Sequence, residues 1–164
     1  MLIPVPEAEA AVASATGRVG AQHGLPVHVT VMYPFAPMRA VDANVRASLG
    51  DLLSGISGFP FVLSGVGRFP GVLYLAPDPA EPFVALTKAV EARWPRYPPY
   101  RGAFAEVIPH VTVQEGSEPP AAVPALERAL PIEATAREVW LMAPAGEGEW
   151  SRVDRFPLAG NGSG

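Results

Sequence analysis

A tetrapeptide that occurs twice sets the strongest constraint on how this chain folds. His-Val-Thr-Val stands at His28–Val31 and again at His110–Val113, 82 positions later. The chain has three histidines, and two of them begin these copies. Each copy closely follows a proline and lies in a run rich in β-branched residues, which favour strands. Such a repeat predicts two similar lobes, each contributing one of these strands.

Strand geometry gives the repeat a chemical meaning. Residues i and i+2 of a strand project from the same face, so His28 lies beside Thr30, and His110 lies beside Thr112. If the lobes face each other, two imidazoles and two hydroxyls converge on one cleft. An imidazole has an unperturbed pKa of about 6.5, so one ring can act as a base while the other acts as an acid. Threonine hydroxyls can donate to phosphate oxygens as charge develops there. This set suits phosphoryl chemistry beside a ribose 2′ or 3′ oxygen, and it needs no metal and no cofactor.

The rest of the chain mixes strand and helix patterns without a regular βαβ rhythm, which favours an α+β fold. Strands are expected at 1–5, 27–33, 61–66, 72–76, 106–114, 132–142 and 150–158. Helices are expected at 7–20, at 42–53 with Asp42 as N-cap, at 81–94 and at 120–130. Loops are expected at 67–71 and at 95–104. We expect one bilobal domain over 1–158 and a flexible tail over 159–164.

Composition excludes several classes of function. The absence of cysteine removes disulfides, thiol nucleophiles and Cys-based metal sites. A net charge of −4 argues against tight binding of long duplex nucleic acid, which requires many contacts from basic side chains to phosphate. No apolar run reaches the roughly 18 residues of a membrane span. We therefore expect a soluble, cytoplasmic, monomeric protein whose partner is a small anionic ligand rather than a membrane.

The chain also resembles a known family. Paired His-x-Thr-x motifs about 80 residues apart are the signature of the two-histidine (2H) phosphoesterase superfamily. Within it, the chain looks like the bacterial 2′-5′ RNA ligase-like branch. Three stretches carry this resemblance beyond the tetrads: PVHVTVMYPF at 26–35, GVGRFPGVLYLAP at 65–77 and YPPYRGAFAEVIPHVTV at 97–113.

The resemblance implies a pseudo-two-fold α+β fold, with antiparallel sheets around a central cleft and helices outside. It implies 2′,3′-cyclic phosphodiesterase or 2′-5′ phosphodiester activity on nucleotides or RNA ends, with possible reverse ligation. By the same match, His28 and His110 would be the acid/base pair, and Thr30 and Thr112 would donate hydrogen bonds to the phosphate.

One position departs from the family pattern. Some relatives carry an arginine shortly after the second motif, where this chain has Gln114 and Glu115. A guanidinium partner for phosphate must then come from elsewhere, and Arg68 and Arg101 are the candidates. Three aromatic residues are candidates to line the cleft and stack on a base: Tyr33, Phe35 and Phe69.

Other interpretations stay open at this point. Histidines on strands are often satisfied residues of a core, and strand threonines are often simple β-branched filler. A zinc site would need a third ligand beyond the two histidines, such as His23. Glu106 is close enough in sequence to orient the His110 imidazole. A non-catalytic module that binds nucleotides or RNA ends on the same scaffold is the alternative to an enzyme.

Overall fold

The structure is a computed structural model and describes residues 1–18 and 22–160. Its described strands form one antiparallel sheet of eight strands in the order β6-β3-β4-β5-β2-β1-β7-β8. The bounds of the strands are β1 Leu2–Pro4, β2 His28–Thr30, β3 Phe59–Phe69, β4 Val72–Asp78, β5 Val111–Glu115, β6 Ile132–Ala136, β7 Glu138–Gly146 and β8 Glu149–Pro157. The two strands that carry the tetrads are neighbours at the centre, with three further strands on each side. The sheet therefore has a pseudo-two-fold order, as the repeat predicted.

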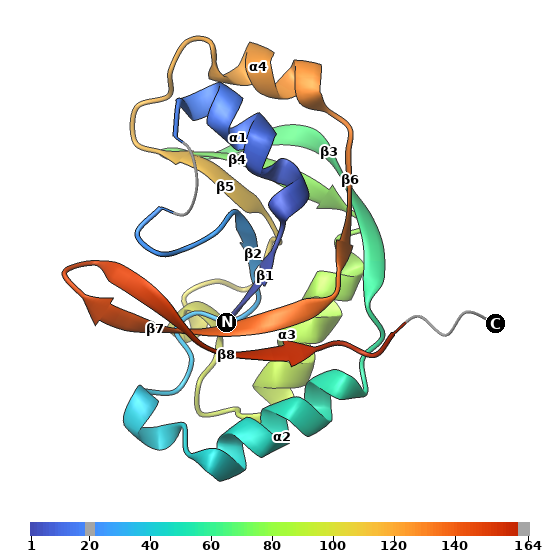
Figure 1. The fold of residues 1–164 in the computed structure, drawn as a ribbon, viewed down its shortest axis with the longest axis vertical. Helices are drawn as coiled ribbons and strands as arrows, with labels where there is room; N and C mark the ends of the chain where they lie inside the picture. The colour runs from blue at the N-terminus through green and yellow to red at the C-terminus, as the bar shows by residue number, and fades with distance from the viewer. Residues whose placement is uncertain (19–21, 161–164) are drawn as a thin grey trace.

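The four α-helices of the described residues lie in two groups at opposite ends of the sheet (Figure 1). Their bounds are α1 Glu9–Thr16, α2 Ala43–Ser54, α3 Glu81–Arg93 and α4 Ala122–Ala129. Helices α1 and α4 pack against each other; α1 also contacts β5, and α4 also contacts β3. Helix α2 packs on β8, and α3 contacts β3 through Phe83, whose ring meets those of Phe59 and Phe61. The α+β class and the bilobal arrangement expected from the sequence are confirmed.

The two expected lobes are halves of one continuous sheet, and they are not the two halves of the chain. The N-terminal strand β1 pairs with β2 and β7, whereas α1, which follows it, packs in the other half against β5 and α4. The chain then returns to the first half for β2. Each lobe is therefore assembled from segments far apart in the sequence.

The core lies between the sheet and the helices. Alternating residues of the central strands point into it, and Val29, Val111, Leu75 and Ile3 are completely buried. Their neighbours in sequence point to the opposite face of the sheet. A buried hydroxyl, that of Thr87 on α3, donates to the Val31 carbonyl at 2.8 Å and so ties this helix to the end of the first tetrad.

Several element bounds differ from the expected ones. The strand expected at 27–33 covers only His28–Thr30, and the one expected at 106–114 begins at Val111. The segment expected at 132–142 is two strands that meet at Arg137. The loop expected at 67–71 shrinks to the Pro70–Gly71 turn, because β3 continues to Phe69 and pairs there with Val72. A β-type run cannot by itself show where pairing partners end.

The ends of helices and of the chain follow local chemistry more closely. Asp42 caps α2 as expected, accepting from the Val45 amide at 2.9 Å. The first helix is shorter than expected, because Gly17 ends it in the left-handed conformation. Ala159, expected to begin the tail, is held by a hydrogen bond to Ile56 and by one from Gly58. The rest of the tail, beyond Gly160, lies outside the described residues, as do residues 19–21. Within the part of the chain described, no helix is long and apolar enough to cross a bilayer.

Candidate active site

The two tetrads lie side by side in antiparallel strands. Val29 pairs directly with Val111, so the strand register sets His28 across from Thr112 and Thr30 across from His110. All four side chains share the face opposite the buried valines, and all four are half-buried. The histidines occupy a diagonal of this square, for which a separation of roughly 7–8 Å, somewhat less between the Cβ atoms, is typical. The fold thus brings together four residues that the sequence keeps 82 positions apart.

The two imidazoles are held in the same local way. His28 Nδ1 lies 2.7 Å from the Pro26 carbonyl oxygen, and His110 Nδ1 lies 2.8 Å from the Ile108 carbonyl oxygen. In each case the partner is two residues earlier in the chain. A carbonyl only accepts, so Nδ1 carries the proton that is donated, and Nε2 of the neutral ring is left as an acceptor for another partner. Both rings are therefore prepared for the same chemistry at Nε2.

The surroundings of the first ring alter its protonation. Burial lowers the pKa of His28 below its usual 6.5, and the hydrogen bond to Pro26 only partly opposes this effect. A positive charge on the N-terminal amine or on His110 lowers the pKa of His28 further when that group is protonated, and burial lowers the pKa of the amine itself to about 5. The first histidine is therefore biased towards its neutral form near neutral pH, and more strongly so when its partner is protonated.

An aromatic wall flanks His110. The Phe69 ring stands edge-on to the imidazole with 5.1 Å between centroids, and the Tyr74 ring is tilted against it at 5.4 Å. The two aromatic rings stack on each other at 4.3 Å, with an interplanar angle of 23°. The sequence indicated Phe69 but missed Tyr74. A signal for it was present, because Tyr74 alternates with the buried Leu73 and Leu75 and so shares the face of the tetrads.

Two of the sequence candidates are placed away from the histidines. Arg68 lies in β3 rather than in a loop, on the face opposite Gly67 and Phe69, and it forms a two-pronged ion pair with Glu118 at 3.0 and 3.1 Å. These hydrogen bonds and the carboxylate charge raise its pKa. Phe35 packs against the rings of Trp94 and Tyr97. Strand alternation thus turns Arg68 away from the face of the tetrads, whereas the cleft role of Phe35 stays a prediction.

The other candidates take different places. Tyr33 is 50 % exposed and meets the Trp150 ring edge-on. Arg101 lies in the loop before the second tetrad, beside a pocket. His23, five residues before His28, is exposed and pairs with Glu149 at 3.2 Å rather than with a side chain of either tetrad.

Two further hypotheses concern groups that would bind the histidines, namely an orienting carboxylate and a zinc ion. The hypothesis that Glu106 orients an imidazole is wrong for His110, because the Ile108 carbonyl holds that ring. For a zinc site, three or more His, Cys, Asp or Glu side chains would have to gather, and residues 1–18 and 22–160 contain no such group.

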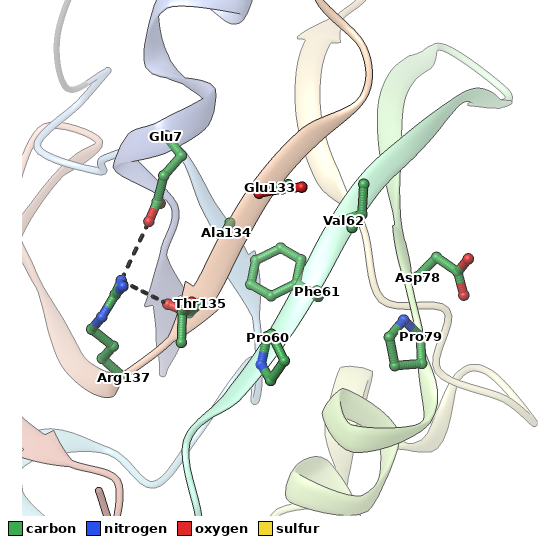
Figure 2. A pocket seen from close by; sticks show the side chains of 10 residues that line it. All are labelled: Glu7, Pro60, Phe61, Val62, Asp78, Pro79, Glu133, Ala134, Thr135 and Arg137. Carbon is green, nitrogen blue, oxygen red and sulfur yellow. Dashed lines mark hydrogen bonds and ion pairs between the residues drawn. The ribbon is translucent and has the colours of Figure 1, made fainter. Parts of the chain in front are cut away.

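One pocket is separate from the tetrads. It has a volume of about 540 Å³ and opens at the β6–β3 edge of the sheet (Figure 2). Arg137 lies at its rim, hydrogen-bonded to Glu7 at 3.3 Å and to the Thr135 carbonyl at 3.4 Å. Its ten described lining residues include no tetrad residue and no substrate-binding candidate.

Comparisons with known proteins agree with this geometry. Among solved structures, a Thermus thermophilus protein, TT0787, superposes with a TM-score of 0.64 at 20 % identity, covering 98 % of this chain and 97 % of its own. Escherichia coli LigT, in a complex with NADP+, gives a TM-score of 0.60 at 18 % identity over 96 % of this chain and 95 % of its own. These likenesses show a shared fold. No curated protein matches the chain significantly.

The sequence also matches a family model over most of its length. Residues 4–148 match the model of the 2′-5′ RNA ligase superfamily, and this range includes both tetrads. Membership of this superfamily supports a phosphoesterase role. The chain belongs to the 2′-5′ RNA ligase superfamily of two-histidine phosphoesterases.

Proposed function

We propose that this protein is a metal-independent phosphoesterase that opens 2′,3′-cyclic phosphates or cleaves 2′-5′ phosphodiesters at the ends of nucleotides or short RNA. The observation that carries the proposal is the square of His28, Thr30, His110 and Thr112 around the Val29–Val111 pair. It offers two proton-transfer groups and two hydroxyl donors on one open face. Two imidazoles, one accepting and one donating a proton, can act on opposite sides of one tetrahedral phosphorus centre.

The proposed hydrolysis divides the proton transfers between the two rings. Neutral His28 accepts a proton from water at Nε2 as the water oxygen bonds to phosphorus. Protonated His110 gives its Nε2 proton to the departing ribose oxygen as the phosphorus–oxygen bond breaks. The lowered pKa of His28 favours this assignment, because a base must be neutral at the working pH. Ligation is the reverse process, in which each ring takes the other role.

The threonines act on the charge that develops in the transition state. Thr30 and Thr112 would donate from their hydroxyls to the two non-bridging phosphate oxygens, one from each strand. Fixed donors of this kind stabilise the transition state more than the ground state, because negative charge increases on those oxygens. Phe69 and Tyr74 provide an aromatic surface beside His110 on which a nucleobase can stack.

The nucleotide class of the substrate has support from structural neighbours. LigT of Escherichia coli has been solved in complexes with 3′-AMP, with ATP and with NADP+. These ligands share a phosphorylated nucleoside, which is the unit that the proposed site would hold. We infer a small nucleotide or an RNA terminus, rather than a long duplex, as the substrate of this chain.

The test is a hydrolysis panel of nucleoside 2′,3′-cyclic phosphates and 2′-5′ dinucleotides. His28→Ala and His110→Ala should each lower kcat/KM by about 10²–10⁴-fold, and EDTA should have no effect. His23→Ala is the matched control, since it removes the third histidine, which pairs with Glu149 on the surface. Full hydrolysis by the double variant of His28 and His110 would exclude the mechanism. Nucleotide binding by the wild type without any turnover would instead indicate a binding module.

A further inference from the structure

A second pocket lies beside the end of the first tetrad strand. It has a volume of about 370 Å³ and is lined by Pro34, Arg96, Tyr97, Pro98 and Arg101. No acidic residue contributes to this lining. Two of the five side chains are arginines, so the pocket carries a local positive charge on a chain whose net charge is −4.

Both guanidinium groups in this pocket are free to bind a ligand. Among residues 1–18 and 22–160, neither Arg96 nor Arg101 has a side-chain hydrogen bond or a carboxylate within ion-pair distance. By contrast, Arg46, Arg68 and Arg137 are each paired with a carboxylate. A planar guanidinium presents a fork of donors that fits two oxygens of a phosphate. Two guanidinium groups in one pocket are therefore suited to bind a phosphate group.

The backbone around the pocket is constrained. Tyr100 and Arg101 both adopt left-handed conformations, with φ of 51° and 57°, which are costly for residues other than glycine. The Tyr100 amide donates to the Tyr33 carbonyl at 2.6 Å, and the Arg101 amide donates to the Pro98 carbonyl at 3.0 Å. These bonds hold residues 98–101 against the segment that follows β2. Strained backbone of this kind is concentrated where proteins bind ligands.

The same segment links the pocket to the tetrads. Pro34 follows Thr30 by four residues, and four extended residues span at most ~14 Å. Successive phosphates of a fully stacked strand advance about 3.4 Å along the helix axis, and an unstacked single strand extends further per nucleotide than that. A strand of a few nucleotides is therefore long enough to reach from the histidines to the pocket, whereas a nucleoside monophosphate has no second phosphate to place there.

We propose that Arg96 and Arg101 form a second phosphate site, which binds a phosphodiester of a short single-stranded oligonucleotide whose terminal phosphate lies between the two histidines. This inference rests on the proposed function for the identity of the terminal phosphate. It adds a length preference: substrates with a further phosphate bind more tightly than mononucleotides.

Equilibrium binding tests the site without requiring turnover. A fluorescently labelled RNA trinucleotide with a 3′-phosphate is titrated against the wild type and against the Arg96→Ala/Arg101→Ala variant. Loss of both guanidinium contacts should weaken binding by about tenfold or more. The slope of log affinity against log salt should also fall in magnitude by about 0.7, as expected for one lost phosphate contact on a single strand. Arg128→Ala, an exposed position on α4, is the matched control and should leave both values unchanged.

The comparison ligands separate the possible outcomes. Binding of a nucleoside 3′-monophosphate should be the same in the wild type and the double variant, because its single phosphate occupies the histidine site. Equal trinucleotide affinity in the wild type and the double variant, or equal losses for the trinucleotide and the monophosphate, would overturn the proposal. Failure of the proposed function appears separately, as absent hydrolysis by the wild type.

Discussion

A single methyl group placed under Tyr74 tests whether the aromatic wall positions His110. Gly67 on β3 pairs with Tyr74, whose ring lies over it. A Cβ at this position would stand 2.5 Å from both Cε2 and the hydroxyl oxygen of the ring, well inside the ordinary contact distance of 3.4 Å. Gly67→Ala should therefore push the ring away by about 1 Å, because a side chain moves more easily than the strand below it.

The size of the effect follows from the contacts that the ring would lose. Its stacking on Phe69 at 4.3 Å contributes about 0.5–1.5 kcal/mol beyond simple burial. Gly65→Ala is the matched control, because it lies on the same strand and a Cβ there meets nothing within 4 Å. Both substitutions restrict the unfolded chain equally. Their difference in unfolding free energy should thus be about 1 kcal/mol, or about 2–4 °C in Tm for a chain of this size.

Urea denaturation measures the stability difference, and the chemical shifts of the His110 ring in NMR spectra report its aromatic neighbours. If the proposed function holds, kcat/KM on a 2′,3′-cyclic phosphate should fall for Gly67→Ala and not for Gly65→Ala, because displacements near 1 Å can be costly at reacting centres. Tyr74→Ala should abolish the effect of the added methyl group in a double-mutant cycle. Equal stability and equal His110 shifts in the two alanine variants would refute the reasoning.

Three further predictions concern the elements around the site. Because burial lowers the pKa of His28 in the folded protein, its contribution to stability is present above about pH 6.5 and is lost as the pH falls below that value. Urea titrations should show that His28→Asn loses less stability between pH 7.5 and 5 than the wild type does, and an identical loss in both proteins would contradict the lowered pKa. Thr87→Val should cost about 1–3 kcal/mol by leaving the Val31 carbonyl without its donor; Thr87→Ser should retain most of the stability, and a neutral valine variant would count against this bond. Asp42→Ala should cost about 1 kcal/mol by removing the cap on Val45, as measured by thermal unfolding against Asp42→Asn, which should be nearly neutral.

Local signals in the sequence predicted the features that depend on neighbouring residues. The Asp42 cap and the start of α3 at Glu81 are set by side chains and prolines close in the chain. The bounds of strands were less accurate, because a strand ends where its partner ends. The run at 27–33 is rich in β-branched residues, yet only His28–Thr30 forms β2.

The candidates for substrate binding also show which features the sequence could predict and which it could not. Phe69, expected to line the cleft, lies against His110, whereas Arg68, next to it, faces the other way and pairs with Glu118. Adjacent residues in a strand point to opposite faces, so the expected loop at 67–71 could not distinguish the two. Tyr74 was missed because its partners, Phe69 and His110, lie on other segments of the chain.

The sequence by itself determined that two identical tetrads exist and that each presents a histidine and a threonine on one face, because that relation depends only on the alternation of a strand. Only the tertiary structure decided that the two strands are direct neighbours and that Val29 opposes Val111. Pairing across the sheet depends on the whole order of eight strands and on helices that cross between its halves. Likewise, the burial of His28 arises from segments that meet only after folding, and so does the positively charged pocket that Arg96 and Arg101 line.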